Sequence, residues 1–130
     1  MSLDALRDEI AGRDGAAYLL TVGSDGRPHT VSVTVSWAEG ELVVAPGNRS
    51  TRNATDRPLV SLLWPPAVRG GFSLIVDATV TSVTGSGSGD NRVVVTPTGA
   101  VLHRPADPGA PGAPASDCAP VYARPDEISS

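Results

Sequence analysis

Apolar and polar side chains alternate without interruption over nine residues, from His29 to Trp37. One face of this segment carries His29, Val31, Val33, Val35 and Trp37, and the other carries Thr30, Ser32, Thr34 and Ser36. Because successive side chains of a β-strand point to opposite faces of a sheet, this period of two predicts a strand with one buried face. It is the clearest secondary-structure signal in the chain.

Shorter apolar segments on both sides of this strand have the composition and length of further strands. Turn signals separate them: Ser24-Asp25-Gly26 and Glu39-Gly40 flank the alternating strand, and Pro65-Pro66 stops a later one. The expected strands are residues 18–22, 29–37, 42–45, 59–64 and 72–83, with two final pieces, 92–96 and 100–104, that are interrupted by Pro97 and Gly99. Six to seven strands at this spacing predict a closed antiparallel barrel.

Two short segments have the pattern of helices or loops. Residues 3–10 place Leu3, Leu6 and Ile10 on one face at helical spacing, with Asp4 as a candidate cap. Residues 48–57 are polar and follow a Pro-Gly break, which is typical of a loop or a short helix.

The chain therefore divides into one domain and a tail. We expect a single domain over residues 1–104, with an N-terminal helix within 1–12 and the barrel over 17–104. Residues 105–130 hold six of the twelve prolines and show almost no periodicity. This composition predicts an extended linker or disorder, unless the tail packs on its own barrel or on a second subunit.

Composition and charge narrow the class of protein. The 130 residues carry a net charge of −4, and all ten basic residues are arginine. Without a broad basic face, neither nucleic acid nor an anionic membrane is expected as a partner. The single cysteine, Cys118, argues against a disulfide framework and a zinc site. Because the apolar runs are too short for a membrane span or a signal peptide, we expect a cytoplasmic protein.

The segment Asn48-Arg49-Ser50-Thr51-Arg52-Asn53 is the best candidate for chemistry. Two guanidinium groups, two hydroxyls and the first amides of a following helix would converge on one anion there. The alternative is a solvated surface turn in which Ser50 or Thr51 caps the helix.

Other candidates have simpler interpretations. His29 and His103 are either ligand contacts or half-exposed strand residues, and no spacing suggests a metal site. Trp37 and Trp64 either pack at the ends of strands or form a wall for a planar ring. No nucleophile-elbow pattern, Gly-x-Ser-x-Gly, stands between a strand and a helix. Residues 85–89 are a Gly/Ser run between two strands, so they are interpreted as a hairpin loop, and no catalytic residue is assigned.

The order of these features resembles the FMN-binding split-barrel family, the pyridoxamine 5′-phosphate oxidase-like proteins, and especially small actinobacterial members that use the deazaflavin coenzyme F-420. The resemblance runs from Ala17 to Arg104. It rests on Tyr18-Leu-Leu-Thr-Val, on Asp25-Gly26-Arg27-Pro28-His29 with the alternating strand, on residues 48–53, on Arg57-Pro58-Leu-Val-Ser-Leu-Leu-Trp64, on Ser73-Leu-Ile-Val-Asp77 and on Val95-Thr-Pro-Thr-Gly-Ala-Val-Leu-His103-Arg-Pro.

The resemblance implies a fold and a cofactor site. The fold would be mainly β, an antiparallel split barrel with a short N-terminal helix and a small helix or loop after the third strand. FMN or coenzyme F-420 would lie at a homodimer interface. Its phosphate would be held by Asn48, Arg49, Ser50, Thr51 and Arg52, and its ring would lie against His29, Val31, Ser32, Val33 and Thr34.

The sequence departs from the family pattern at several of these positions. Asn48 and Ser50 replace the hydroxyl and lysine that flank the arginine of the phosphate loop, and Val31 and Ser36 stand where oxidases present basic residues to FMN. We therefore expect a flavin- or deazaflavin-binding oxidoreductase acting on a small molecule by hydride transfer, and not a true pyridoxamine phosphate oxidase. The alternative is a non-catalytic split barrel, either empty or carrying a ligand without turnover. The spread of arginines favours F-420 over FMN.

Overall fold

The computed structural model describes residues 2–13, 16–85, 90–105 and 116–123. Two helices and eight strands make up this part of the chain. They are α1 (Leu3–Ala11), β1 (Ala16–Val22), β2 (Pro28–Thr34), β3 (Ser36–Ala38), β4 (Glu41–Val44), α2 (Asn48–Asp56), β5 (Leu59–Trp64), β6 (Ser73–Thr84), β7 (Arg92–Pro105) and β8 (Ser116–Ala123). Neither helix of this part is long and apolar enough to cross a membrane.

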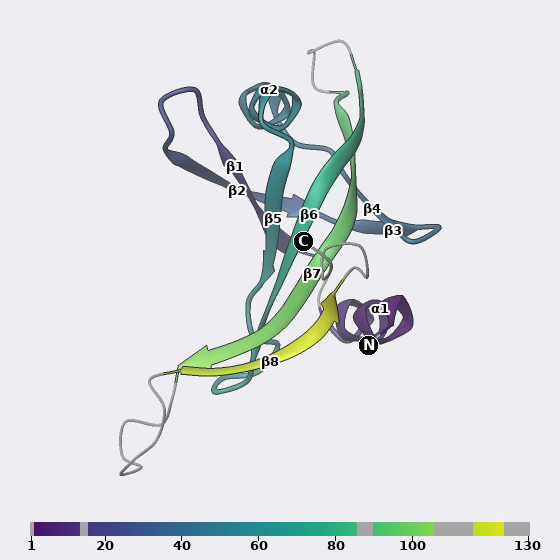
Figure 1. Ribbon diagram of the computed structural model, residues 1–130, viewed down its shortest axis with the longest axis vertical. Helices are drawn as coiled ribbons and strands as arrows, with labels where there is room; N and C mark the ends of the chain where they lie inside the picture. Colours follow the sequence, from purple (N-terminus) through teal and green to yellow (C-terminus); the bar gives the residue numbers. More distant parts are fainter. Residues whose placement is uncertain (1, 14–15, 86–89, 106–115, 124–130) are drawn as a thin grey trace.

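The eight strands form one curled antiparallel sheet (Figure 1). Its order is β2-β1-β5-β6-β7-β4-β3, and β8 is added beside β7. β7 pairs with β6 along its length, while its other edge pairs first with β4 and then with β8. β2 and β3 are the first and last strands in this order, yet only Val35 separates them in the sequence. The two edges of the sheet are therefore joined by one continuous segment of chain. This arrangement confirms the predicted mainly β, antiparallel split barrel.

The strand expected over residues 29–37 is in fact two strands. β2 pairs with β1 up to Thr34, and β3 pairs with β4 from Ser36 onward. The alternation of buried and exposed side chains continues through Val35, as the sequence pattern requires. The prediction of one unbroken strand is wrong because a period of two reports which side is buried, and this side stays the same when the chain changes its pairing partner.

The two final pieces predicted from the sequence form one long strand, β7. Pro97 pairs with Ala78 and Gly99 pairs with Asp77, so Thr98 is an extra residue opposite β6. Such a bulge lets a strand continue past a residue that has no backbone N–H. The interruption expected at Pro97 is therefore a bulge and not the end of a strand.

Part of the expected tail belongs to the sheet. Residues 116–123 form β8, which pairs with β7 from Gly99 to Pro105. Val121 is buried and joins the core, a contribution that the proline-rich composition of residues 105–130 conceals. Residues 106–115, 124–130 and the loop 86–89 lie outside the described residues, and the division into a domain over 1–104 and a tail over 105–130 stays a prediction.

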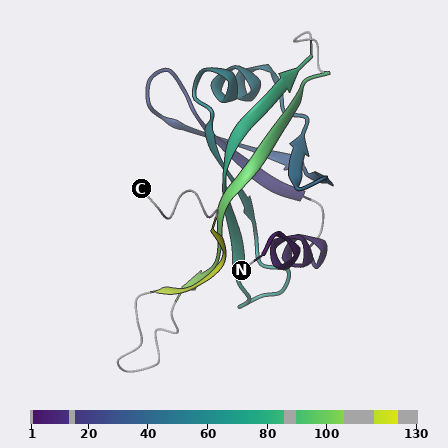
Figure 2. The ribbon, with the colours of Figure 1, turned by 45° about the vertical axis from the view of Figure 1, so that its right-hand side comes forward.

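Helix α1 lies at one end of the sheet and α2 at the other (Figures 1 and 2). Ser2 caps α1 by accepting a hydrogen bond from the Ala5 amide at 3.2 Å, so the cap is not Asp4. Leu6 is fully buried in the core. That core is mainly aliphatic and includes Trp64, which therefore packs inside and does not form a ligand wall. Trp37 is partly buried against it.

Candidate functional site at the α2 end of the barrel

Helix α2 has a buried face and an exposed face, although its sequence is almost entirely polar. Ser50, Asn53 and Ala54 are buried against the barrel, at the spacing of one helical face. The Asn53 amide donates to the Thr21 hydroxyl at 3.2 Å, so the buried polar groups of the two elements satisfy each other. Arg49 and Arg52 lie on the exposed face. Tertiary packing therefore holds the helix, and its cationic side chains face outward.

The start of α2 leaves its first amides available. Gly47 is the N-cap, and no side chain of the part that the structure describes caps the helix there. Thr51 instead donates its hydroxyl to the Gly47 carbonyl at 2.9 Å. The alternative in which Ser50 or Thr51 serves as the cap is therefore wrong. A helix start of this kind presents N–H groups and the positive end of the helix dipole to an anion.

Arg49 and Arg52 line a polar hollow of about 450 Å³ between α2 and the turn that joins β1 to β2. We call it the arginine hollow; its lining also includes Gly23, Ser24, Asp25, Asn48, Asn53, Asp56 and Arg57. Three arginines face two aspartates, which leaves a positive excess in a chain of net negative charge. Neither Arg49 nor Arg52 forms a hydrogen bond or ion pair with another described residue.

Arg57 has a different role in this hollow. Its Nε donates to the Val22 carbonyl at 2.6 Å and so fastens the end of α2 to the end of β1. The β1–β2 turn is closed by the Gly23 amide, which donates to the Arg27 carbonyl at 2.9 Å, and by Asp25, which accepts from the Arg27 amide at 3.0 Å. These hydrogen bonds hold the two segments that line the hollow, the C-terminal end of α2 and the β1–β2 turn.

A second hollow, of about 360 Å³, lies at the start of α2. We call it the helix-start hollow. Asn48, Thr51, Arg52, Gly85 and Asn91 line it. Asn48 and Arg52 therefore belong to both hollows, and they mark where the two meet.

The residues of β2 that were predicted to line the cofactor ring belong to neither hollow. Ser32 and Thr34 are exposed, His29 and Val31 are half-buried, and Val33 is a core residue at 8 % exposure. The arginine hollow is lined from the β1–β2 turn rather than from these positions. Within the proposed phosphate loop, the structure brings Asn48, Arg49, Thr51 and Arg52 to the hollows and buries Ser50. Whether these residues bind a cofactor stays a prediction.

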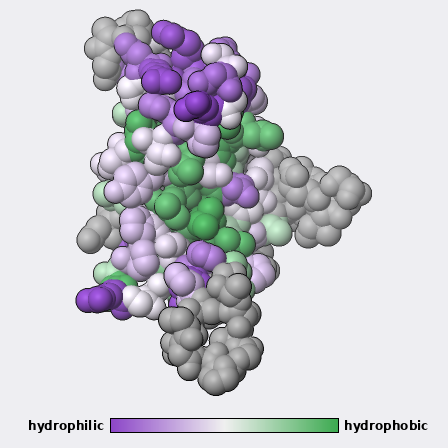
Figure 3. Space-filling model, turned by 90° about the vertical axis from the view of Figure 1, so that its left-hand side faces the viewer, coloured by the Kyte–Doolittle hydropathy of each residue, from purple (hydrophilic) through white to green (hydrophobic). Residues whose placement is uncertain are grey.

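Sequence reasoning missed a third feature, an apolar face on the outer side of the sheet. Tyr18, Leu63, Ile75 and Val101 lie in register across β1, β5, β6 and β7, on the side opposite the core. The face that carries the β1–β2 hairpin shows a central hydrophobic area below a hydrophilic upper end (Figure 3). The available signal was that β1 and β5 are apolar on both faces, which is typical of strands covered on both sides.

A groove of about 490 Å³ opens on this outer face near α2. Its lining includes Leu20, Val22, Leu59, Ser61 and Asp77. The Ser61 hydroxyl donates to the Asp77 carboxylate at 2.7 Å, and Thr21, Thr79 and Thr98 add further polar side chains to the lining. At the far end of the sheet, His103 and Cys118 approach to 3.1 Å across β7 and β8. No group of three or more metal-ligating side chains occurs among the residues that the structure describes.

Two mycobacterial proteins are similar to the chain in sequence. They are the uncharacterized proteins Mb0449c of Mycobacterium bovis and MT0457 of Mycobacterium tuberculosis, each 39 % identical over 108 residues. The alignment covers 75 % of this chain and 76 % of each relative. The chain belongs to their family. No family model matches this member of the family.

Solved structures show that this family has the pyridoxamine 5′-phosphate oxidase-like split-barrel fold. An F420 reductase superposes with a TM-score of 0.60 at 18 % identity and covers 72 % of the chain and 94 % of its own length. A putative pyridoxamine 5′-phosphate oxidase from Listeria innocua gives a TM-score of 0.63 at 15 % identity, with coverages of 77 % and 96 %. The fold expected from the sequence is therefore confirmed.

Proteins with this fold carry different ligands. An FMN-binding protein from Syntrophomonas wolfei has a TM-score of 0.61 at 10 % identity, covering 77 % of this chain and 84 % of that one. HutZ from Vibrio cholerae, a heme storage protein, has a TM-score of 0.57 at 18 % identity, with coverages of 77 % and 94 %. Likeness at this identity shows the fold, and the ligand has to be argued from the residues of the site.

Proposed function

We propose that this protein binds a phosphorylated flavin-type cofactor, FMN or coenzyme F-420, at the α2 end of its barrel. The observation that supports the proposal most is the pair of exposed guanidinium groups of Arg49 and Arg52, which bond to no other described residue, beside a helix start that no described side chain caps. Arginine binds phosphate through two parallel hydrogen bonds, and helix amides add further donors. Structures with the same fold include an F420 reductase and an FMN-binding protein.

The residues fit an anionic group without rearrangement of the core. Asn48 and Arg52 would hold a phosphate at the helix start, and Arg49 would contact it from the arginine hollow. Thr51 lines the same hollow, but its hydroxyl and amide both donate to the Gly47 carbonyl. Ser50 would contribute its amide, because its side chain is buried. The exposed hydroxyls of Ser32 and Thr34 on β2 would line the ring. Once bound, such a cofactor supplies hydride transfer, while the protein binds and orients it.

The two adjoining hollows favour F-420 over FMN. FMN ends in a single phosphate, which the helix-start hollow alone would satisfy. F-420 carries a phosphodiester and additional carboxylates, which the neighbouring arginine hollow would hold next to Arg49 and Arg57. The preference is modest, because charges on exposed groups are screened beyond about 8 Å at physiological salt. We expect F-420 to bind more tightly than FMN, and more so at low salt.

The same proposal includes a homodimer formed through the outer sheet face. The row of Tyr18, Leu63, Ile75 and Val101 is apolar, and strands that are apolar on both faces are normally covered on both. Tyr18 is 42 % exposed and Leu59, beside the row, 73 % exposed in the single chain. A second copy would cover them and close the groove beside α2, where the cofactor and a small-molecule substrate would lie.

The second candidate is a carrier that binds its ligand without turnover. HutZ, a heme storage protein of the same fold, favours this class. An absorbance scan of the purified protein separates the candidates. Flavin and deazaflavin bands would support the oxidoreductase, and a Soret band would support the heme carrier.

Removal of Arg49 and Arg52 tests the site itself. Hydrogen bonds to charged groups are each worth about 1.5–3 kcal/mol, so the double substitution to alanine is expected to weaken FMN and F-420 binding on the order of a hundredfold. Both side chains are exposed, so the thermal midpoint is expected to stay near that of wild type. The control replaces Arg7 and Arg69, which are also exposed, by alanine. It removes the same charge elsewhere. Equal affinities in the wild-type and Arg49/Arg52 proteins would contradict the assignment.

A further inference from the structure

Asn91 is a buried amide that links the start of β7 to the start of α2. The residue is 3 % exposed. Its Nδ2 donates to the Pro46 carbonyl at 3.3 Å and to the Asn48 Oδ1 at 2.8 Å. The backbone of Gly85, which has φ 121°, approaches Asn91 closely; a Cβ on Gly85 would lie 2.7 Å from the Asn91 Cα and 3.0 Å from its Oδ1. The amide therefore has little room to shift.

The contact with Pro46 determines which way the Asn48 amide points. A backbone carbonyl only accepts hydrogen bonds, so Asn91 has to present its donor group, Nδ2, towards Pro46 and Asn48. Asn48 then has to present an acceptor, its Oδ1, to Asn91. The Asn48 Nδ2 donor is directed away from Asn91. Because Asn48 lines both the helix-start hollow and the arginine hollow, this donor is available where the two meet.

We propose that Asn91 is a positioning residue, which orients Asn48 so that its amide donates to the anionic group of the cofactor. This inference rests on the proposed function. It adds a residue that lies 43 positions from Asn48 in the sequence and that the resemblance does not include. Without Asn91, the Asn48 amide is free to rotate and present its oxygen, which repels a phosphate or carboxylate.

A double-mutant cycle on affinity tests the inference. The variants are Asn91→Ala, Asn48→Ala and the combination, titrated with FMN and with F-420 by fluorescence. We expect Asn48→Ala to weaken binding about tenfold, since one hydrogen bond to a charged group is lost. Asn91→Ala is expected to weaken binding by a smaller factor, on the order of a few fold, because the Asn48 donor remains and only its orientation is lost. The combination is expected to be no weaker than Asn48→Ala alone, because Asn91 acts only through Asn48.

Asn91→Asp supplies a readout that a purely structural role would not give. Its carboxylate can only accept, so Asn48 is expected to turn its Nδ2 towards the new acceptor and its Oδ1 towards the ligand. Binding should then be weaker than in Asn91→Ala, and this extra loss should shrink when Asn48→Ala is added, because only the direct repulsion of the anion by the carboxylate, which lines the helix-start hollow, then remains. Thermal unfolding of every variant identifies any that do not fold, and Asn91→Ala carries the test if Asn91→Asp fails.

The outcomes separate the inference from the proposed function. If the wild-type protein binds neither FMN nor F-420, both are wrong. If it binds one of them and the losses from Asn91→Ala and Asn48→Ala simply multiply, or Asn91→Ala binds like wild type, the role of Asn91 is wrong while the cofactor site stands.

Discussion

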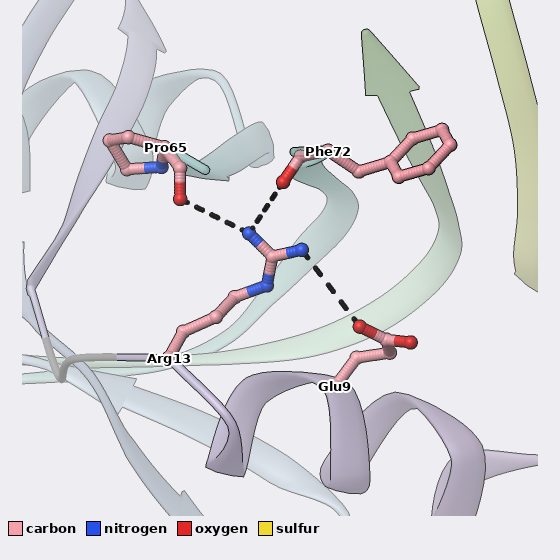
Figure 4. Close-up of polar contacts among 4 residues, drawn as sticks. All are labelled: Glu9, Arg13, Pro65 and Phe72. Atoms are coloured by element: carbon pink, nitrogen blue, oxygen red, sulfur yellow. Dashed lines mark hydrogen bonds and ion pairs between the residues drawn. The ribbon is translucent and has the colours of Figure 1, made fainter. Parts of the chain in front are cut away.

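Arg13 is expected to be the polar side chain that contributes most to the stability of the α1 end of the barrel. Its side chain is only 9 % exposed, and its Nη1 donates to the Phe72 carbonyl at 2.9 Å and to the Pro65 carbonyl at 3.1 Å (Figure 4). These carbonyls flank the loop between β5 and β6. The Glu9 carboxylate lies 3.8 Å from the Nη2, and its side chain is 39 % exposed. The Nε is buried and has no hydrogen-bond partner among the residues described.

The substitution Arg13→Met keeps the length of the side chain and removes these contacts. Loss of the partly buried bond to Phe72 costs about 1.5–3 kcal/mol, because the donor is charged. The bond to Pro65 is exposed, so water replaces it and about 0.5–1 kcal/mol is lost. Removal of the unsatisfied Nε–H returns about 1 kcal/mol. The free energy of unfolding should fall by about 2 kcal/mol, which lowers the thermal midpoint by about 6 °C.

Urea denaturation followed by tryptophan fluorescence measures this change, since buried Trp64 directly precedes Pro65. Glu9→Gln is expected to cost under about 0.5 kcal/mol, because an exposed ion pair at this distance is weak. Arg27→Met serves as the matched control, with a side chain that is 87 % exposed. An Arg13→Met protein as stable as the Arg27→Met control, or a Glu9→Gln protein as unstable as Arg13→Met, would refute the reasoning.

Two further predictions concern neighbouring residues of β5 that face opposite sides of the sheet. Leu62→Ala should lower the free energy of unfolding by about 2–5 kcal/mol in urea denaturation, because Leu62 is fully buried, and a smaller loss than that of Leu59→Ala would contradict the core assignment. Leu63→Asp should convert the proposed dimer to a folded monomer in sedimentation at tens of micromolar, because a carboxylate would be placed in the outer apolar row. Val68→Asp, at an exposed apolar residue outside that row, should leave the dimer intact. A wild-type protein that sediments only as a monomer would contradict the dimer.

The strands could be predicted from the sequence where one face alone is buried. The alternation from His29 to Trp37 gave the correct buried side for every residue, because side-chain period depends only on the strand itself. It could not show that pairing changes at Val35, since pairing is decided by strands that are distant in the sequence. β8 was hidden for a related reason: its single buried apolar side chain, Val121, is covered through pairing with β7.

The candidate site could be predicted only in part. Arg49 and Arg52 stand out because two cations close together in an acidic chain are visible in the sequence. The burial of Ser50 could not be predicted, because a polar helix has no hydrophobic periodicity to show which face is buried. The cap was assigned wrongly because the polar sequence does not show where the helix begins. Ser50 and Thr51 are good capping residues, but α2 begins before them, at Asn48.

The position of Asn91 shows why side-chain orientation at such a site escapes sequence reasoning altogether. Its relation to Asn48 exists only because β7 and the start of α2 meet at one end of the barrel. A pattern read along the chain reports burial on one element, whereas the direction of the Asn48 amide depends on Asn91, which the Pro46 carbonyl orients in turn. In this fold the strands supply the frame and α2 supplies the charge. Under the proposed function, whether Asn48 presents a donor or an acceptor to the anion depends on its contact with Asn91.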